Sequence, residues 1–77
     1  MRQEYFFLMI ADSLMYPGKS YRERERYRRD LHWFINQKFP GYADRRFRSN
    51  SEAAVFARKI QNYFNVAFDI MPAVDVD

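Results

Sequence analysis

Two serine–glutamate pairs, each followed by a helical pattern of apolar residues, most constrain the fold of this 77-residue chain. Ser20 precedes Glu23 by three positions, and Ser49 precedes Glu52 by the same spacing. In such a capping box the serine and glutamate side chains accept hydrogen bonds from backbone N–H groups that the first helical turn leaves free. The sequence therefore predicts two helices, which separate three further segments of the chain.

The first predicted helix runs from Ser20 to about Phe39, and Pro40 with Gly41 ends it. The second begins at Ser49, and Asn65 is expected to end it in the left-handed conformation. Both helices show the spacing of an amphipathic helix. Their expected core-facing residues are Tyr27, Leu31, Phe34 and Ile35 in the first helix, and Ala53, Phe56, Ala57, Ile60, Tyr63 and Phe64 in the second.

The three remaining segments read as strands. Residues 4–11 are apolar without alternation, which is typical of a central strand covered on both faces. Residues 42–48 alternate weakly and predict an edge strand, and residues 66–71 predict a third strand that Pro72 ends. The order β-α-β-α-β predicts a small α/β or α+β domain over 1–72, with a three-stranded sheet, its first strand central, and two packed helices. The acidic tail over 73–77 is expected to be frayed.

The second half of this pattern, a strand, a serine-capped helix and a strand, distantly resembles the closing half of a ferredoxin-like fold. Two helices on one side of the sheet would leave its other face bare. The chain also contains fifteen aromatic residues, more than a core of this size buries. Either the helices cover opposite faces or a second subunit covers the sheet, and we expect a homodimer.

Several classes of protein are excluded by composition. The chain has no cysteine, so it has no disulfide, thiolate nucleophile or cysteine-based zinc site. With only Gly18 and Gly41 it has no glycine-rich phosphate loop, and we expect no cofactor and no metal site. The longest apolar run, residues 5–11, is too short to span a membrane, and no signal peptide is recognisable. We therefore expect a cytoplasmic protein without a membrane partner.

The charge is concentrated in the middle of the chain. Residues 19–59 carry twelve Lys and Arg against five Asp and Glu, a local charge of +7, within a net charge of +3. Such asymmetry favours an anionic partner. Ten of the thirteen basic residues are arginine, whose planar guanidinium suits phosphate, carboxylate or base edges. A GC-rich genome would produce the same bias.

One face of the first helix carries the strongest functional signal. Arg22, Arg26, Arg29 and Trp33 fall within an arc of roughly 60° at the helical repeat. Arginines could contact phosphates there while the indole stacks on a base. The same face could instead contact a protein, or it could be solvated, with Glu25 and Asp30 neutralising part of its charge.

A second basic cluster, Arg45, Arg46 and Arg48, surrounds Phe47 in the predicted edge strand. Arginine and aromatic side chains on a strand can hold single-stranded RNA, but the glycine-rich aromatic motif of the RNA-recognition fold is absent. Phe47 is therefore expected in the core.

Two other residues, Asp12 and His32, are of types that often act in catalysis. Asp12 follows the first strand, as a catalytic carboxylate does in many α/β enzymes and in small dimeric ferredoxin-like nucleases. An aspartate that ends a strand explains it equally. His32, the one histidine, has no nucleophile or second ligand at useful spacing and is expected to be a partly buried structural residue.

The sequence thus predicts a small non-enzymatic binding module that contacts nucleic acid, or a nucleic-acid-bound complex, through Arg22, Arg26, Arg29, Trp33, Arg45, Arg46 and Arg48. The first alternative is a protein-interaction or inhibitor protein of the phage or mobile-element type. The second is a metal-dependent dimeric nuclease that uses Asp12.

Overall fold

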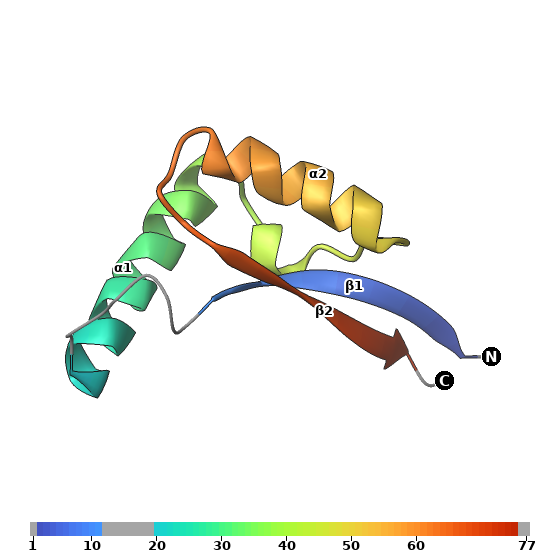
Figure 1. The fold of residues 1–77 in the computed structure, drawn as a ribbon, viewed down its shortest axis with the longest axis horizontal. Coiled ribbons are helices and arrows are strands. Elements are labelled where there is room, and N and C mark those ends of the chain that lie inside the picture. The colour runs from blue at the N-terminus through green and yellow to red at the C-terminus, as the bar shows by residue number, and fades with distance from the viewer. Residues whose placement is uncertain (1, 12–19, 76–77) are drawn as a thin grey trace.

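The computed structural model of the protein describes residues 2–11 and 20–75 (Figure 1). Its elements are strand β1 (Gln3–Ile10), helix α1 (Tyr21–Lys38), the short 3-10 helix η1 (Tyr42–Asp44), helix α2 (Asn50–Gln61) and strand β2 (Phe68–Asp75). Within these residues the protein is an α+β domain with two α-helices and a two-stranded antiparallel sheet. The Pro17–Gly18 pair predicts a loop over 15–19, and this segment lies outside the described residues.

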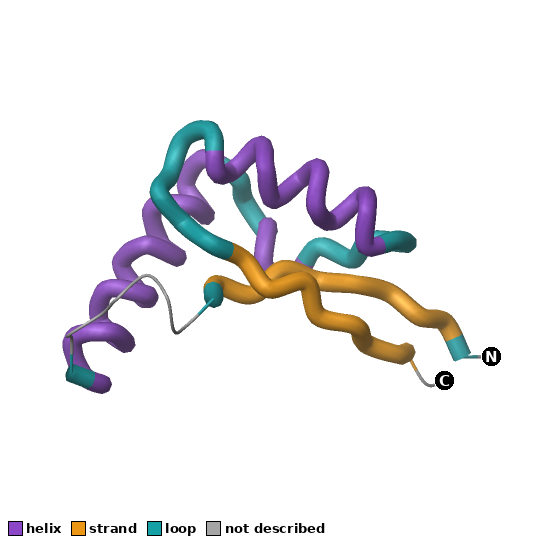
Figure 2. The backbone as a smooth tube through the Cα atoms, in the orientation of Figure 1, coloured by secondary structure: helices purple, strands orange, loops and turns teal. Residues whose placement is uncertain are grey.

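The two strands of the sheet come from opposite ends of the chain and lie side by side (Figure 2). β1 pairs with β2 along its whole length, from Gln3 opposite Asp75 to Ile10 opposite Phe68. On its other edge β1 meets Phe47, which exchanges two backbone hydrogen bonds of 2.8 Å with Phe6. β1 is therefore bordered on both edges, but within the described chain its second neighbour is a single bridge rather than a strand.

The strand predicted over 42–48 is wrong, and with it the three-stranded, ferredoxin-like layout. After α1 the chain turns at Gly41, whose φ of 73° is left-handed, and winds into η1. This places Tyr42 in the core at 1% exposure. The alternation over 42–48 is weak, whereas burial of a tyrosine ring removes a large aromatic surface from water. Packing of Tyr42 thus overrides the local pattern, and Phe47 alone keeps a strand-like pairing.

The third predicted strand exists, but Pro72 does not end it, because β2 continues to Asp75. The peptide groups of Phe6 point away from β2 toward Phe47, and Phe6 lies opposite Pro72 in the register. In an antiparallel pair the nitrogen of Pro72 then points to the free edge of β2, where the ladder needs no N–H. Residues 73–75 therefore belong to the sheet rather than to a frayed tail.

The core lies between one face of the sheet, α2 and the segment that follows α1. The serine hydroxyl of Ser49 accepts a hydrogen bond from the backbone N–H of Glu52 at 3.1 Å, so the predicted cap of α2 is confirmed. The predicted end is wrong: α2 stops at Gln61, and within the described residues no residue other than glycine has a positive φ, so Asn65 is not left-handed. The buried residues are Leu8, Ile10, Ile35, Tyr42, Phe47, Ala53, Ala57, Ile60 and Val66.

Helix α1 is bounded as predicted but packs differently. Ser20 caps it and Phe39 follows its last turn. Ile35 is buried and Leu31 is half-buried, whereas Tyr27 and Phe34 are 49% and 56% exposed. The reason is visible in Figure 1, where α1 stands at one end of the sheet and its first turns extend away from α2. Neither described helix is long and apolar enough to cross a membrane.

The two faces of the sheet differ in how far other elements of the protein cover them. Side chains of even-numbered β1 residues, such as Leu8 and Ile10, point into the core, and α2 packs on that side (Figure 1). Side chains of odd-numbered residues point to the other side, where Met9 and Met71 are 47% and 36% exposed. We call this surface the open sheet face; it consists of Tyr5, Phe7, Met9, Met71 and Ala73.

Candidate functional site

Four of the predicted site residues share one exposed face of α1. Arg22, Arg26, Arg29 and Trp33 all lie in the helix, and all are exposed. Ile35, the buried residue of α1, follows Trp33 by two positions and so projects from the opposite side. Residues 22 and 33 are about 16 Å apart along the helix axis. We call this surface the α1 arginine face.

The arginines of this face keep their hydrogen-bond donors available. Oppositely charged residues four positions apart in a helix predict ion pairs of Glu25 with Arg29 and of Arg26 with Asp30. The structure instead pairs Glu25 with Arg28 at 3.3 Å. Within the described part of the chain, Arg22, Arg26 and Arg29 form no ion pair. Their guanidinium groups can therefore meet an external anion without first breaking an ion pair with another described residue.

Exposed aromatic rings lie on α1 at Trp33 and on the side of the helix between the α1 arginine face and Leu31. Trp33 is 58% exposed and meets Phe34 edge to face, with ring centroids 5.2 Å apart. Tyr27 lies one helical turn before Leu31 and is also exposed. Burying such rings in a complex would release more free energy than burying charged side chains of the same size. The sequence placed Tyr27 and Phe34 in the core, so it missed them as surface residues.

The structure does not join the second basic cluster to the α1 arginine face. The guanidinium of Arg45 lies 4.4 Å from the ring centre of Phe56. That of Arg46 lies 4.4 Å from the ring centre of Tyr5 and forms an ion pair with Asp75. Arg48 is exposed, and its neighbour Phe47 is buried, as predicted.

Arg45 and Arg46 therefore contact aromatic and carboxylate partners within the domain that sequence spacing does not show. Arg45 lines a hollow beside α2 together with Lys59, whereas Arg46 lines another beside Tyr5. Each guanidinium already has a ring partner, so neither is as available to a ligand as the arginines of α1.

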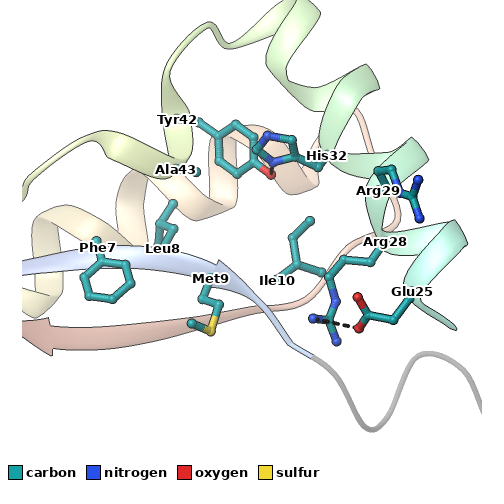
Figure 3. A pocket seen from close by; sticks show the side chains of 10 residues that line it. All are labelled: Phe7, Leu8, Met9, Ile10, Glu25, Arg28, Arg29, His32, Tyr42 and Ala43. Atoms are coloured by element: carbon teal, nitrogen blue, oxygen red, sulfur yellow. Dashed lines mark hydrogen bonds and ion pairs between the residues drawn. The ribbon is translucent and has the colours of Figure 1, made fainter. Parts of the chain in front are cut away.

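A cleft of about 420 Å³ lies between β1 and α1 (Figure 3). Leu8 and Ile10 contribute apolar surface on one side, His32 and Tyr42 lie opposite, and the Arg28–Glu25 ion pair stands at one end. The sequence offered no signal for this cleft, because its walls come from β1, α1 and η1. It adjoins the α1 arginine face, since Arg29 belongs to both.

The best-defined contact in the cleft joins the hydroxyl of Tyr42 to Nδ1 of His32 over 2.7 Å. Burial raises the pKa of Tyr42 to about 12. His32 itself is more exposed than expected, but its ring rests against Tyr42 with centroids 5.2 Å apart. The pair supplies a polar contact at the edge of the core, which is a structural role.

The remaining candidates form no site in the described residues. Asp12 lies outside them, and no cluster of three His, Asp or Glu side chains within them could hold a metal ion.

Comparisons with protein-family models, curated proteins and solved structures find no match to this chain.

Proposed function

We propose that this protein is a non-enzymatic binding module that contacts nucleic acid through the α1 arginine face. The observation that carries the proposal is the joint exposure of three arginines and a tryptophan on one side of a helix, with no internal ion pair to the arginines among the described residues. Guanidinium groups donate to phosphate oxygens, and an exposed indole offers a flat surface on which a base can stack.

Single-stranded nucleic acid is the form that this face suits best. Bases in a duplex are stacked on one another, so an indole can stack only on an unpaired base. Trp33 lies at one end of the row of arginines, about one helical turn beyond Arg29. A strand that runs along α1 can thus place phosphates on the arginines and a base on Trp33.

The experiment is a titration of fluorescently labelled single- and double-stranded DNA and RNA, followed by anisotropy at several salt concentrations. Each phosphate contact to a single strand contributes about −0.7 to the slope of log affinity against log salt. The double variant Arg22→Ala/Arg26→Ala is expected to flatten that slope by about 1.4. Arg58→Ala/Lys59→Ala, which removes two exposed cations from α2, is the matched control and should change the slope little.

Trp33 gives the second arm of the test. Trp33→Ala is expected to weaken single-strand binding by about tenfold while leaving the salt slope unchanged, because stacking on one base contributes about 1–3 kcal/mol and involves no counterion release. Far-UV circular dichroism should show a folded variant, since the side chain is 58% exposed. The proposal would be refuted if Arg22→Ala/Arg26→Ala bound single strands as strongly as the control Arg58→Ala/Lys59→Ala does. Binding that does not respond to salt would refute it as well.

A protein partner is the second candidate, and the exposed rings of Trp33, Phe34 and Tyr27 favour it. Tryptophan and arginine are enriched at the centres of protein interfaces. This candidate takes precedence if no oligonucleotide binds the folded protein and a partner protein co-purifies in fixed stoichiometry with the natural chain but not with Trp33→Ala.

A further inference from the structure

The cleft between β1 and α1 lies beside the α1 arginine face, and phosphate contacts alone leave it unused. Arg29 belongs to both surfaces, and His32, which lines the cleft, precedes Trp33 directly in α1. A strand that lies along the arginines thus passes one side of the cleft. We propose that the cleft takes one unpaired base of that strand, and that Glu25 selects a base with an exocyclic amino group, such as cytosine, over uracil or thymine. This inference rests on the proposed function.

The walls of the cleft suit the flat faces of a base. Its volume of about 420 Å³ is that of a small-molecule site. Leu8 and Ile10 of β1 provide apolar side chains on one side, and the rings of His32 and Tyr42 lie on the other (Figure 3). Proteins that recognise single strands hold an unpaired base against aromatic and apolar side chains and contact its edge by hydrogen bonds. Such walls can hold a base, but they do not distinguish one base from another.

A charged pair at one end of the cleft can make that distinction. One carboxylate oxygen of Glu25 lies 3.3 Å from a guanidinium nitrogen of Arg28, and both side chains are about one-third exposed, at 38% and 31%. The other oxygen of Glu25 has no partner among the described residues. Arg28 therefore holds the carboxylate in place and leaves one oxygen as an acceptor. With Arg29, the lining carries two guanidinium groups against one carboxylate, so it does not repel a phosphate at its mouth.

A carboxylate distinguishes pyrimidines by the group at position 4 of the ring. Cytosine carries an amino group there, which donates a hydrogen bond, and glutamate is a known partner of this group. Uracil and thymine carry a carbonyl oxygen at that position, and their one N–H lies between two such oxygens. The free oxygen of Glu25 can accept from the amino group, whereas it repels the carbonyl oxygens. The expected preference for cytosine is about tenfold, the size of one hydrogen bond to a charged group.

The test compares oligo(dC) with oligo(dU) of equal length, by fluorescence anisotropy at neutral pH and one salt concentration. Both strands carry the same phosphates and bases of the same size, so the ratio of their affinities reports the contact to the base edge. The natural chain should prefer oligo(dC) about tenfold. Glu25→Gln should bring the ratio close to one, because an amide is both donor and acceptor. Glu23→Gln makes the same change in α1 outside the cleft lining and should keep the preference.

Methyl NMR of the same complexes tests where the base lies. An aromatic base in the cleft should shift the methyl resonances of Ile10, whereas those of Val55, exposed on α2, should not move. Equal affinity ratios for the natural chain and Glu25→Gln, or an unchanged Ile10 signal, would refute this inference. If the salt dependence still requires Arg22 and Arg26, the proposed function stands without it. If no oligonucleotide binds the folded protein, both are wrong.

Discussion

At the scale of single residues, Tyr42 shows most directly how packing decides this structure. It directly follows the left-handed Gly41 and is 1% exposed, with its hydroxyl bonded to His32. Its ring also meets Phe68 of β2 at 5.9 Å, so one side chain links η1, α1 and the sheet. Such a residue matters to stability in a core that contains few large buried side chains.

The raised pKa of Tyr42 makes folding sensitive to alkaline pH. In the unfolded chain a tyrosine loses its proton near pH 10, whereas burial keeps Tyr42 protonated to about pH 12. Between these values the unfolded state binds fewer protons than the folded state, so the free energy of unfolding falls as pH rises. We expect a loss of roughly 1 kcal/mol per pH unit above pH 10, measured by urea unfolding from pH 9 to 11.5.

Tyr42→Phe is the control for this prediction. It keeps the ring but removes the ionisable hydroxyl, so its stability should fall less between pH 10 and 11.5 than that of the natural chain. At pH 7 the variant should be less stable by about 1 kcal/mol, because the hydrogen bond to His32 is lost. Identical pH profiles for the two proteins would contradict the assignment.

At the scale of elements, the start of α2 depends on one hydroxyl. Ser49 accepts a hydrogen bond from the N–H of Glu52, and Glu52 in turn accepts one from the N–H of Arg48 at 3.2 Å. Ser49→Ala is expected to lower the free energy of unfolding by about 1 kcal/mol. Ser51→Ala, two positions later on the exposed side, should change it by much less. Urea unfolding at one fixed protein concentration measures both.

The turn between α1 and η1 requires the backbone conformation of Gly41, and not the absence of a side chain at that position. A Cβ atom there would meet nothing within 4 Å, but the φ of 73° is unfavourable for other residues. Gly41→Ala is expected to destabilise the protein by about 1 kcal/mol, and Gly41→Asn by less, because asparagine tolerates this conformation. Equal effects of the two substitutions, measured by the same unfolding experiment, would mean that the turn rearranges.

The sequence predicts these elements well where the signal is local. Both serine caps, the ends of α1 and most of the apolar face of α2 follow from spacing within one or two turns. Tyr63, which the sequence places on that apolar face, is instead 64% exposed and lies beyond the end of α2. The predictions fail where a long-range contact decides. Tyr42 leaves its predicted strand to fill the core, and Pro72 stays within β2 because its nitrogen faces a free edge. Neither fact can be read from neighbouring residues.

At the scale of the whole molecule, the candidate site was predictable in part. Helical periodicity is enough to place Arg22, Arg26, Arg29 and Trp33 together, and the structure shows them exposed. Helical periodicity cannot show that Arg45 lies over Phe56, or that Arg46 contacts Tyr5 and Asp75, because those partners come from other elements. The same limit applies to the exposure of Phe34, which depends on how far α1 extends beyond its neighbours.

The uneven distribution of buried residues predicts uneven local stability. α2 contributes Ala53, Ala57 and Ile60 to the core, whereas Ile35 is the one buried residue among those described in α1. A helix that buries little apolar surface opens at a low free-energy cost, so its amides exchange with solvent more readily. We expect residues 21–30 to exchange hydrogen for deuterium faster than residues 53–60, by mass spectrometry at neutral pH.

Addition of a single-stranded oligonucleotide should then slow exchange in residues 21–33 and leave α2 unchanged, because a ligand that binds only the folded helix raises the cost of opening it. Equal exchange in α1 and α2 of the free protein would contradict the expected difference in stability.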